Sequence, residues 1–189
     1  MPERNLDGMR VAILVSTNFE QVELEEPMEA LAQAGADCRI VSPTQGKITG
    51  MKHDEKKDNF NVDFTLDQVN PDQFDAVMIP GGALNSDFLR VIPKAQDFVK
   101  KVNSAGKPMA IICHGPWLLV SAGLVKGRTL TSYHTIQDDI RNAGGNWVDR
   151  EVVRDGNWVT SRQPSDLQAF NREMVNVFSE LRQPVNRAA

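Results

Sequence analysis

Short apolar runs recur along the chain, and segments with helical spacing separate them. Four of the runs have the length of a strand and are apolar on both faces, which is typical of strands buried in a parallel sheet. These runs are residues 10–16 (RVAILVS), 38–42 (CRIVS), 75–80 (DAVMIP) and 108–113 (PMAIIC). The helical segments are residues 27–35, 87–106 and 116–123. This alternation predicts a doubly wound α/β domain, in which a mostly parallel sheet lies between helices.

Two segments depart from the alternation. In residues 43–72, apolar side chains alternate at Phe60, Val62 and Phe64, which predicts short antiparallel strands after a charged loop. In residues 151–161 (EVVRDGNWVTS), an Asp-Gly pair supplies the positive φ angles that a type I′ turn needs, so we expect a small β-hairpin there.

The last predicted helix spans residues 165–181, with Ser165 as a candidate N-cap. No internal repeat or linker interrupts the pattern. We therefore expect a single domain over residues 1–189.

Length, charge and cysteine content narrow the classes of protein. A chain of 189 residues can bury a sufficient core in one domain. The net charge of −4 and the pI near 5.4 argue against a nucleic-acid partner, which would require clustered lysine and arginine. The polar segment MPERNLDGMR indicates neither a signal peptide nor a membrane span. Two cysteines, Cys38 and Cys113, cannot build a disulfide framework, so we expect a reducing, cytoplasmic location and no membrane partner.

Cys113 is the first candidate for chemistry. It lies between a predicted strand and a predicted helix, at the carboxyl end of the strand, where ligands bind in open α/β sheets. A sharp turn there exposes the side chain, as in a nucleophile elbow, and a helix N-terminus favours the thiolate. Gly115 suits the crowding of such a turn, although Ile111 departs from the G-x-S-x-G pattern. From these residues alone, the alternative is a buried cysteine that packs as a small hydrophobic side chain.

Four motifs make the chain similar to a known family. They are PGG at 80–82, ICHGP at 112–116, TSYHTIQDDIRNAGGNWVD at 131–149 and EVVRDGNWVTSR at 151–162. Together they resemble the PfpI intracellular protease family, within the class I glutamine amidotransferase-like superfamily that also contains the parkinsonism-associated deglycase. The resemblance implies a flavodoxin-like α/β sandwich and a nucleophilic Cys113.

The resemblance also implies a carboxyl partner for the sulfur. Glu20 matches the family's glutamate on the loop after the first strand, and in similar proteins this carboxyl stays protonated and hydrogen-bonds the thiolate. The alternative is that Glu20 is one of several acids near a helix N-terminus, where negative charge is favourable. We apply that second interpretation to the neighbouring acids Glu23, Glu25, Glu26 and Glu29.

His114 directly follows the cysteine and is the candidate proton carrier. An acidic residue could orient its ring. In the PfpI pattern this acid follows PGG and comes from a neighbouring subunit, and here Asp87 is the nearest match. The loop is one residue longer than the family pattern and aspartate is shorter than the usual glutamate, so Asp87 could also be a first-turn acid of the following helix.

Gly81 and Gly82 follow a strand that we expect beside the strand of Cys113. Backbone N–H groups of Gly82 and His114 could therefore face one oxygen and form an oxyanion hole. The alternative is an ordinary Gly-Gly turn.

The remaining candidates concern the walls of the site. Tyr133 matches a family tyrosine near the pocket, His134 and Arg162 are candidates to line the cleft, and Trp117 could form a wall. The three histidines lack metal-ligand spacing, so we expect no metal. Glycine-rich phosphate motifs are absent, so we expect no nucleotide cofactor.

Together these residues predict covalent hydrolysis by a stress-response cysteine hydrolase. Cys113 attacks a carbonyl carbon, backbone donors hold the oxyanion and His114 moves the proton. The resemblance implies peptide, amide or dicarbonyl-derived substrates, and a homodimer or larger homo-oligomer. Two alternatives stay open: a redox sensor that uses oxidation of Cys113, and a chaperone-like stress protein.

Overall fold

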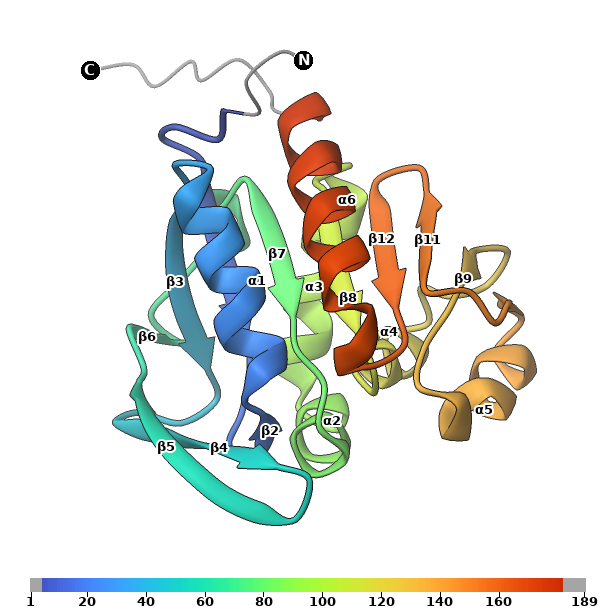
Figure 1. Cartoon of the computed structure of the whole chain (residues 1–189), viewed down its shortest axis with the longest axis horizontal. Coiled ribbons are helices and arrows are strands. Elements are labelled where there is room, and N and C mark those ends of the chain that lie inside the picture. The colour runs from blue at the N-terminus through green and yellow to red at the C-terminus, as the bar shows by residue number, and fades with distance from the viewer. Residues whose placement is uncertain (1–4, 182–189) are drawn as a thin grey trace.

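The computed structural model describes residues 5–181 and has a seven-stranded sheet at its centre (Figure 1). The strand order is β11-β12-β8-β7-β1-β3-β6, and all neighbours are parallel except the β11–β12 pair. The strands are β1 (Arg10–Leu14), β3 (Asp37–Ser42), β6 (Phe64–Thr65), β7 (Ala76–Ile79), β8 (Met109–Ile112), β11 (Val152–Asp155) and β12 (Trp158–Ser161). The predicted mostly parallel α/β sheet is confirmed.

Helices cover both faces of this sheet (Figure 1). One face carries α1 (Val22–Gln33) and α6 (Leu167–Glu180), and the other carries α2 (Ala83–Arg90), α3 (Pro93–Ser104) and α4 (Pro116–Ser121). The helix α5 (Gln137–Asn142) packs near α4. Short 3₁₀ turns lie at Pro71–Gln73, His134–Ile136 and Pro164–Asp166. None of the helices within residues 5–181 combines the length and the apolarity needed to cross a membrane.

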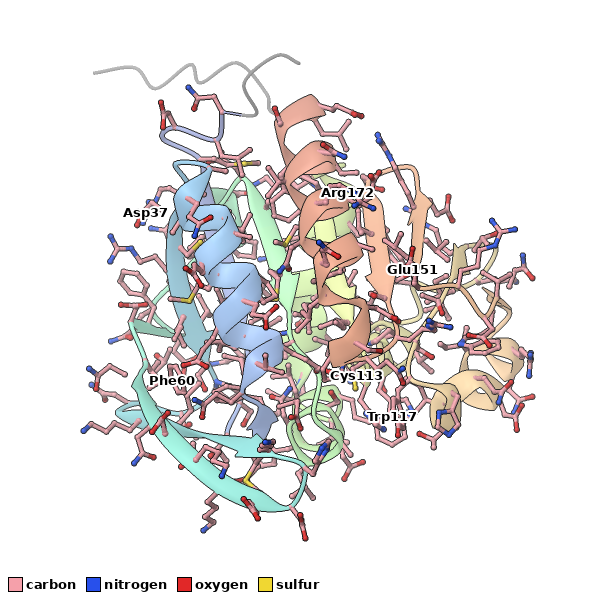
Figure 2. The ribbon with its side chains drawn as sticks, in the orientation of Figure 1. Asp37, Phe60, Cys113, Trp117, Glu151 and Arg172 are labelled. Atoms are coloured by element: carbon pink, nitrogen blue, oxygen red, sulfur yellow. The ribbon has the colours of Figure 1, made fainter. Side chains whose placement is uncertain are left out.

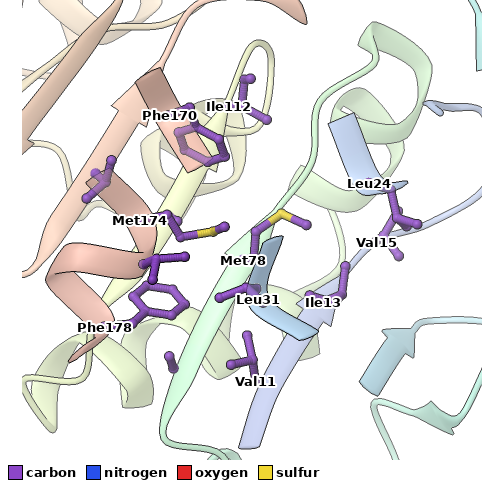
Figure 3. Packing of buried hydrophobic residues seen from close by; sticks show 14 of the residues in the cluster. Val11, Ile13, Val15, Leu24, Leu31, Met78, Ile112, Phe170, Met174 and Phe178 are labelled. Atoms are coloured by element: carbon purple, nitrogen blue, oxygen red, sulfur yellow. The ribbon is translucent and has the colours of Figure 1, made fainter. Parts of the chain in front are cut away.

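Alternation of side chains along the strands builds two hydrophobic cores. In β1, Val11 and Ile13 face the helices α1 and α6, whereas Ala12 and Leu14 face the opposite layer. Figure 3 shows the first core, in which side chains of β1, β7 and β8 meet those of α1 and α6. Burial on both faces explains why these strands are continuous apolar runs in the sequence.

Two smaller sheets complete the fold. The first has the order β2-β4-β5, from β2 (Phe19–Glu20), β4 (Lys47–Lys52) and β5 (Glu55–Asn61). Its β4–β5 hairpin extends below the lower end of the main sheet in Figure 1. The second pairs β9 (Thr129–Leu130) with β10 (Asn146–Trp147).

Several boundaries differ from those that the sequence predicts. Helix α1 begins at Val22 rather than at Pro27, so Pro27, a residue typical of the first position of a helix, lies inside it. The predicted helix over 87–106 is two helices, α2 and α3. The expected charged loop before Phe60 is strand β5, one arm of an exposed hairpin. The predicted hairpin near the C-terminus is confirmed as β11–β12, but its turn differs from the prediction. Asp155 pairs with Trp158 at the end of the strands, so Gly156 and Asn157 form the turn, and of these two Gly156 alone has a positive φ, which is not the expected Asp-Gly type I′ turn.

The topology sets the position of the site. The strands β8, β7 and β1 are neighbours and parallel, so their carboxyl ends meet at one edge of the sheet. Cys113 follows β8, the Gly81-Gly82 pair follows β7, and the segment that leads to α1 follows β1. Side chains from three distant parts of the sequence therefore converge there, as expected for an open α/β sheet.

Candidate active site

Cys113 sits in a strained turn at the carboxyl end of β8 (Figure 2). Its φ is 61°, a left-handed value that is uncommon for a residue other than glycine. Hydrogen bonds hold both of its backbone groups: its N–H donates to the carbonyl of Ser161 at 3.0 Å, and its carbonyl accepts from Tyr133 N–H at 2.8 Å. The side chain is 6% exposed and lines a cavity of about 450 Å³. This geometry is that of the predicted nucleophile elbow.

The carboxyl group beside the sulfur belongs to Glu23, not to Glu20 as the sequence analysis predicts. Glu23 is fully buried in the first turn of α1, and its Oε2 accepts a hydrogen bond from Gly81 N–H at 2.9 Å. The carboxyl group and the Cys113 thiol also affect each other's pKa, and Glu23 Oε1 is buried without a hydrogen-bond partner among the described residues. The start of α1 at Val22 explains the difference, because it turns Glu23 toward the sheet edge.

Glu20 lies elsewhere on the same cavity. It belongs to β2 and is part-buried, and its Oε2 accepts a hydrogen bond from His53 N–H at 3.0 Å. This contact ties Glu20 to the tip of the β4–β5 hairpin. Glu20 is therefore a wall residue of the cavity rather than the partner of the sulfur.

Burial dominates the electrostatics of the Glu23 and Cys113 pair. Desolvation raises the pKa of Glu23 to about 8, so the carboxyl is mostly neutral at pH 7. Desolvation and the charge of Glu23 also raise the pKa of the Cys113 thiol, whereas backbone N–H groups of Gly82 and His114 lower it. The helix N-terminus was expected to lower the pKa of the thiol. Burial has the larger effect, because α4 is short and the sulfur is shielded from water. The pair behaves as two coupled acids that compete for protons.

The Gly81-Gly82 turn places the backbone N–H of Gly82 beside the sulfur and that of Gly81 on the Glu23 carboxyl group. A Cβ at Gly81 would lie 3.0 Å from Cys113 Sγ and would also meet the Glu23 carboxyl group. Gly82 has a φ of 88°, and a Cβ there would lie 2.6 Å from the backbone nitrogen of Glu20. Only glycine fits both positions without displacing backbone or the reactive side chain.

Asn85, a residue that was not predicted, holds this turn in place. It is fully buried in α2. Its Nδ2 donates to the carbonyl of Gly81 at 2.9 Å, and its Oδ1 accepts from Ser16 N–H at 2.7 Å, after β1. One amide side chain therefore joins the ends of two neighbouring strands. The sequence offers one weak signal for it, an asparagine three positions after PGG, and its burial is known only from the structure.

His114 is positioned by contacts within the chain. Its Nδ1 lies 3.2 Å from Cys113 Sγ, and its Nε2 lies 3.3 Å from Thr135 Oγ1. The ring stacks on Tyr133 with 4.8 Å between centroids, and Trp117 packs 5.5 Å away. Burial, together with the nearby His134, lowers the pKa of His114 to about 4, so the imidazole is neutral at pH 7. A neutral imidazole next to a thiol is able to accept its proton.

Asp87 is exposed on α2, and the ring nitrogens of His114 contact Cys113 and Thr135 instead. The structure therefore assigns the intramolecular orientation of the ring to a hydroxyl group rather than to an acid. The expected role of Asp87 across a subunit interface stays a prediction.

Other predicted residues support the site from outside the cavity. Trp117 and His134 pack beside His114 and Tyr133, respectively. Arg162 pairs with Asp166 and with an aspartate of the preceding loop, so its guanidinium anchors the start of α6 rather than facing the cavity. Gly115 is the N-cap residue of α4.

The cavity has walls from six segments of the chain. Several of these residues were not predicted, because nothing in the local sequence links them to Cys113. The described residues that line the cavity are Asn18, Glu20, Glu23, Met51, His53, Gly82, Ala83, Leu84, Cys113, His114, Tyr133, Gln163, Pro164 and Ser165. Within residues 5–181, no group of three or more metal-ligating side chains is placed to hold a metal ion.

Comparison with known proteins finds close relatives over most of the chain. A profile of the DJ-1/PfpI family matches residues 9–177. The chain is 48% identical over 169 residues to "Deglycase PfpI" of Pyrococcus furiosus, covering 89% of this chain and 99% of the relative. It is 38% identical over 169 residues to "Protein/nucleic acid deglycase 2" of Escherichia coli, covering 89% of this chain and 96% of the relative. A ThiJ/PfpI domain protein from Brachyspira murdochii has the same fold, with a TM-score of 0.85, 23% identity, and coverage of 93% of this chain and 99% of that one.

Proposed function

Since the chain belongs to the DJ-1/PfpI family, we propose that it is a cysteine-dependent hydrolase that removes carbonyl-derived adducts from amines and thiols. The observation that carries this proposal is the arrangement around Cys113. A strained thiol in a cavity faces a buried carboxyl group, two backbone N–H donors and a neutral imidazole. The relatives named deglycases support the choice of substrate class.

Protonation of Glu23 is central to how the thiol would react. Below pH 8 the neutral carboxyl adds no negative charge beside the sulfur, and its O–H can donate to a thiolate. Backbone N–H groups of Gly82 and His114 favour the same anion. The proton of the thiol passes to the neutral imidazole of His114, 3.2 Å away. We therefore assign Glu23 the role that the resemblance implied for Glu20.

The proposed reaction needs no external oxidant or reductant. In a methylglyoxal adduct the amine is bound to the aldehyde-derived carbon; that C–N bond breaks to give the aldehyde carbonyl, and the imidazolium of His114 returns its proton to the leaving nitrogen. Sγ adds to this carbonyl carbon, and the electron pair of the C=O bond moves to oxygen, where N–H groups of Gly82 and His114 donate. A proton then shifts from the sulfur-bearing carbon to the neighbouring carbonyl carbon, so that the first carbon is oxidised and the second is reduced, and water hydrolyses the resulting thioester. For a methylglyoxal adduct, the net change is addition of one water to give the free amine and a hydroxy acid.

Release of amine from a methylglyoxal adduct of N-acetyl-lysine amide tests this proposal. We expect turnover by the wild-type protein, loss of at least about a thousandfold in Cys113→Ser, and near wild-type activity in Cys38→Ser, the matched control. A fluorogenic peptide assayed in parallel measures the peptidase alternative. If neither substrate reacts while low peroxide oxidises Cys113, the redox-sensor alternative is supported instead and the hydrolase proposal fails.

We also propose that the chain forms a homodimer through an apolar face of α2. Among the described residues, Leu84, Phe88 and Val91 are 62%, 49% and 66% exposed, and their spacing places them along one side of the helix. Asp87 lies on the same helix, which fits a role across the interface. Light scattering should report a dimer for the wild-type protein and a monomer for Phe88→Glu. The same mass for both proteins would contradict the proposal.

The cytoplasm is the proposed location. The function requires a reduced thiol, and a reducing compartment preserves one.

A further inference from the structure

The ionisable side chains of the cavity wall favour negative over positive charge. The described residues that line it carry two carboxyl groups, from Glu20 and Glu23, and two imidazoles, from His53 and His114, and they include no lysine or arginine. Glu23 is fully buried and engaged by Gly81, and His114 is packed between aromatic rings. The burial of both groups favours their neutral forms. Glu20 is therefore the carboxyl group of the wall that keeps contact with solvent.

Glu20 is held in a defined place on this wall. Its backbone pairs with Met51 of β4, and its Oε2 accepts the N–H of His53, which has a left-handed φ of 58° at the hairpin tip. Both Met51 and His53 also line the cavity. The hairpin tip and Glu20 thus form one connected part of the cavity wall. A carboxylate fixed in a cleft with apolar walls attracts cations more strongly than one on an open surface.

We propose that Glu20 is a specificity-determining residue that makes the cavity favour substrates with a positive charge near the reactive carbonyl, such as adducts on guanidinium groups. Neutral adducts, such as those on thiols, would bind without this attraction. Anionic adducts, such as those on a nucleoside monophosphate, would be disfavoured. The inference rests on the proposed function for its choice of substrate, but the charge preference itself is a property of the cavity and can be measured separately.

The first test probes the cavity without any turnover. Three methanethiosulfonate reagents with a cationic, a neutral and an anionic head group each transfer their thioalkyl group to the cysteine, forming a mixed disulfide and releasing methanesulfinate. In a Cys38→Ser background, only Cys113 can react. For Cys113, the reaction rate of the cationic reagent is divided by that of the anionic reagent, which cancels the thiolate fraction. Dividing this ratio by the same ratio for a small free thiol removes the intrinsic difference between the reagents, so the result reports the electrostatic potential at Cys113.

We expect this normalised ratio to exceed 1 and to fall about tenfold in Glu20→Gln, as expected for loss of about 1.4 kcal/mol of charge preference. Glutamine keeps an oxygen that can accept the His53 N–H, so the variant removes the charge and preserves the tie to the hairpin. Glu26→Gln is the matched control, because Glu26 is exposed on α1 and does not line the cavity. An equal ratio in wild type and Glu20→Gln would overturn the proposal.

The second test uses substrates of different charge. We compare methylglyoxal adducts of N-acetyl-arginine amide, N-acetyl-cysteine amide and guanosine monophosphate. Glu20→Gln should raise KM for the arginine adduct about tenfold and change KM for the cysteine adduct less than about twofold. It should lower KM for the nucleotide adduct. An equal loss on all three would instead show that Glu20 only positions the hairpin, and would overturn the proposal.

The two tests separate this inference from the proposed function. If the reagent ratio depends on Glu20 but no adduct is hydrolysed, the charge preference stands and the hydrolase assignment fails. If adducts are hydrolysed but neither the reagent ratio nor the KM pattern depends on Glu20, the hydrolase assignment stands and this inference fails.

Discussion

The two cysteines of this chain occupy contrasting environments. Cys38 lies in the regular strand β3, and burial raises its pKa to about 12. Cys113 lies one residue beyond the end of β8, in a left-handed turn, where burial is accompanied by N–H donors, an imidazole and a carboxyl group that is neutral at pH 7. Cys38 is part-buried and Cys113 is buried. The groups placed around the sulfur, rather than greater exposure, therefore set the candidate nucleophile apart.

The largest expected effect is in the labelling of the two thiols. A pKa near 12 makes the thiolate of Cys38 about a thousandfold rarer at pH 7 than that of an ordinary cysteine. Burial also raises the pKa of the Cys113 thiol, but the imidazole of His114 lies 3.2 Å from its sulfur and can accept the proton. We expect iodoacetamide to label Cys38 about a thousandfold more slowly than a free thiol and to label Cys113 faster than Cys38, as measured by peptide mass spectrometry. Equal labelling rates for Cys38 and Cys113 would show that their different surroundings do not change the reactivity of the thiol.

Gly82→Ala should reduce kcat/KM about a hundredfold, because a Cβ there would collide with the backbone of Glu20 and displace a donor that faces the sulfur. Gly127→Ala is the control, since Gly127 also has a positive φ, of 76°, but has open space around it. Both variants carry the conformational cost of alanine at a positive φ. If they lose the same activity, the position of the Gly82 N–H is irrelevant to the reaction.

Glu23 should make folding stability depend on pH. Its pKa is raised from 4.5 to about 8 by folding, so its contribution to stability is fully present below pH 4.5 and is lost as pH rises toward 8. One such group changes the free energy of unfolding by at most about 1.4 kcal/mol per pH unit. In urea titrations from pH 5 to 8, Glu23→Gln should lose less stability than wild type as pH rises. Parallel pH dependence in both proteins would mean that Glu23 is ionised when folded.

Thr135→Val should give the smallest effect, about fivefold in kcat, because it removes one hydrogen-bonding group beside His114 Nε2. Thr135→Ser keeps the hydroxyl and should restore most of the activity. An equal loss of kcat in Thr135→Val and Thr135→Ser would indicate that the methyl group of Thr135, rather than its hydroxyl group, positions the imidazole of His114.

Much of this arrangement follows from local sequence patterns. The four buried strands, the turn at Cys113 and the β11–β12 hairpin depend on residues that are close together in the chain, so periodicity and turn chemistry predict them. Parallel strand order then places the Gly81-Gly82 pair near Cys113. The helix boundary at Val22 was less predictable, because Pro27 is typical of a helix start and here lies inside the helix.

The sequence by itself determined the class of fold and the place of the candidate nucleophile Cys113 with its adjacent histidine, since each depends on short-range patterns. Only the tertiary structure decided which carboxyl group meets the sulfur, that Asn85 joins two strand ends, that Thr135 holds the imidazole and that a hairpin tip closes the cavity. Glu23 is 90 positions from Cys113 in the chain, and its contact depends on the start and direction of α1 relative to the sheet edge. Side chains three residues apart, such as Glu20 and Glu23, look equivalent in sequence but face different surroundings once the backbone around them is folded.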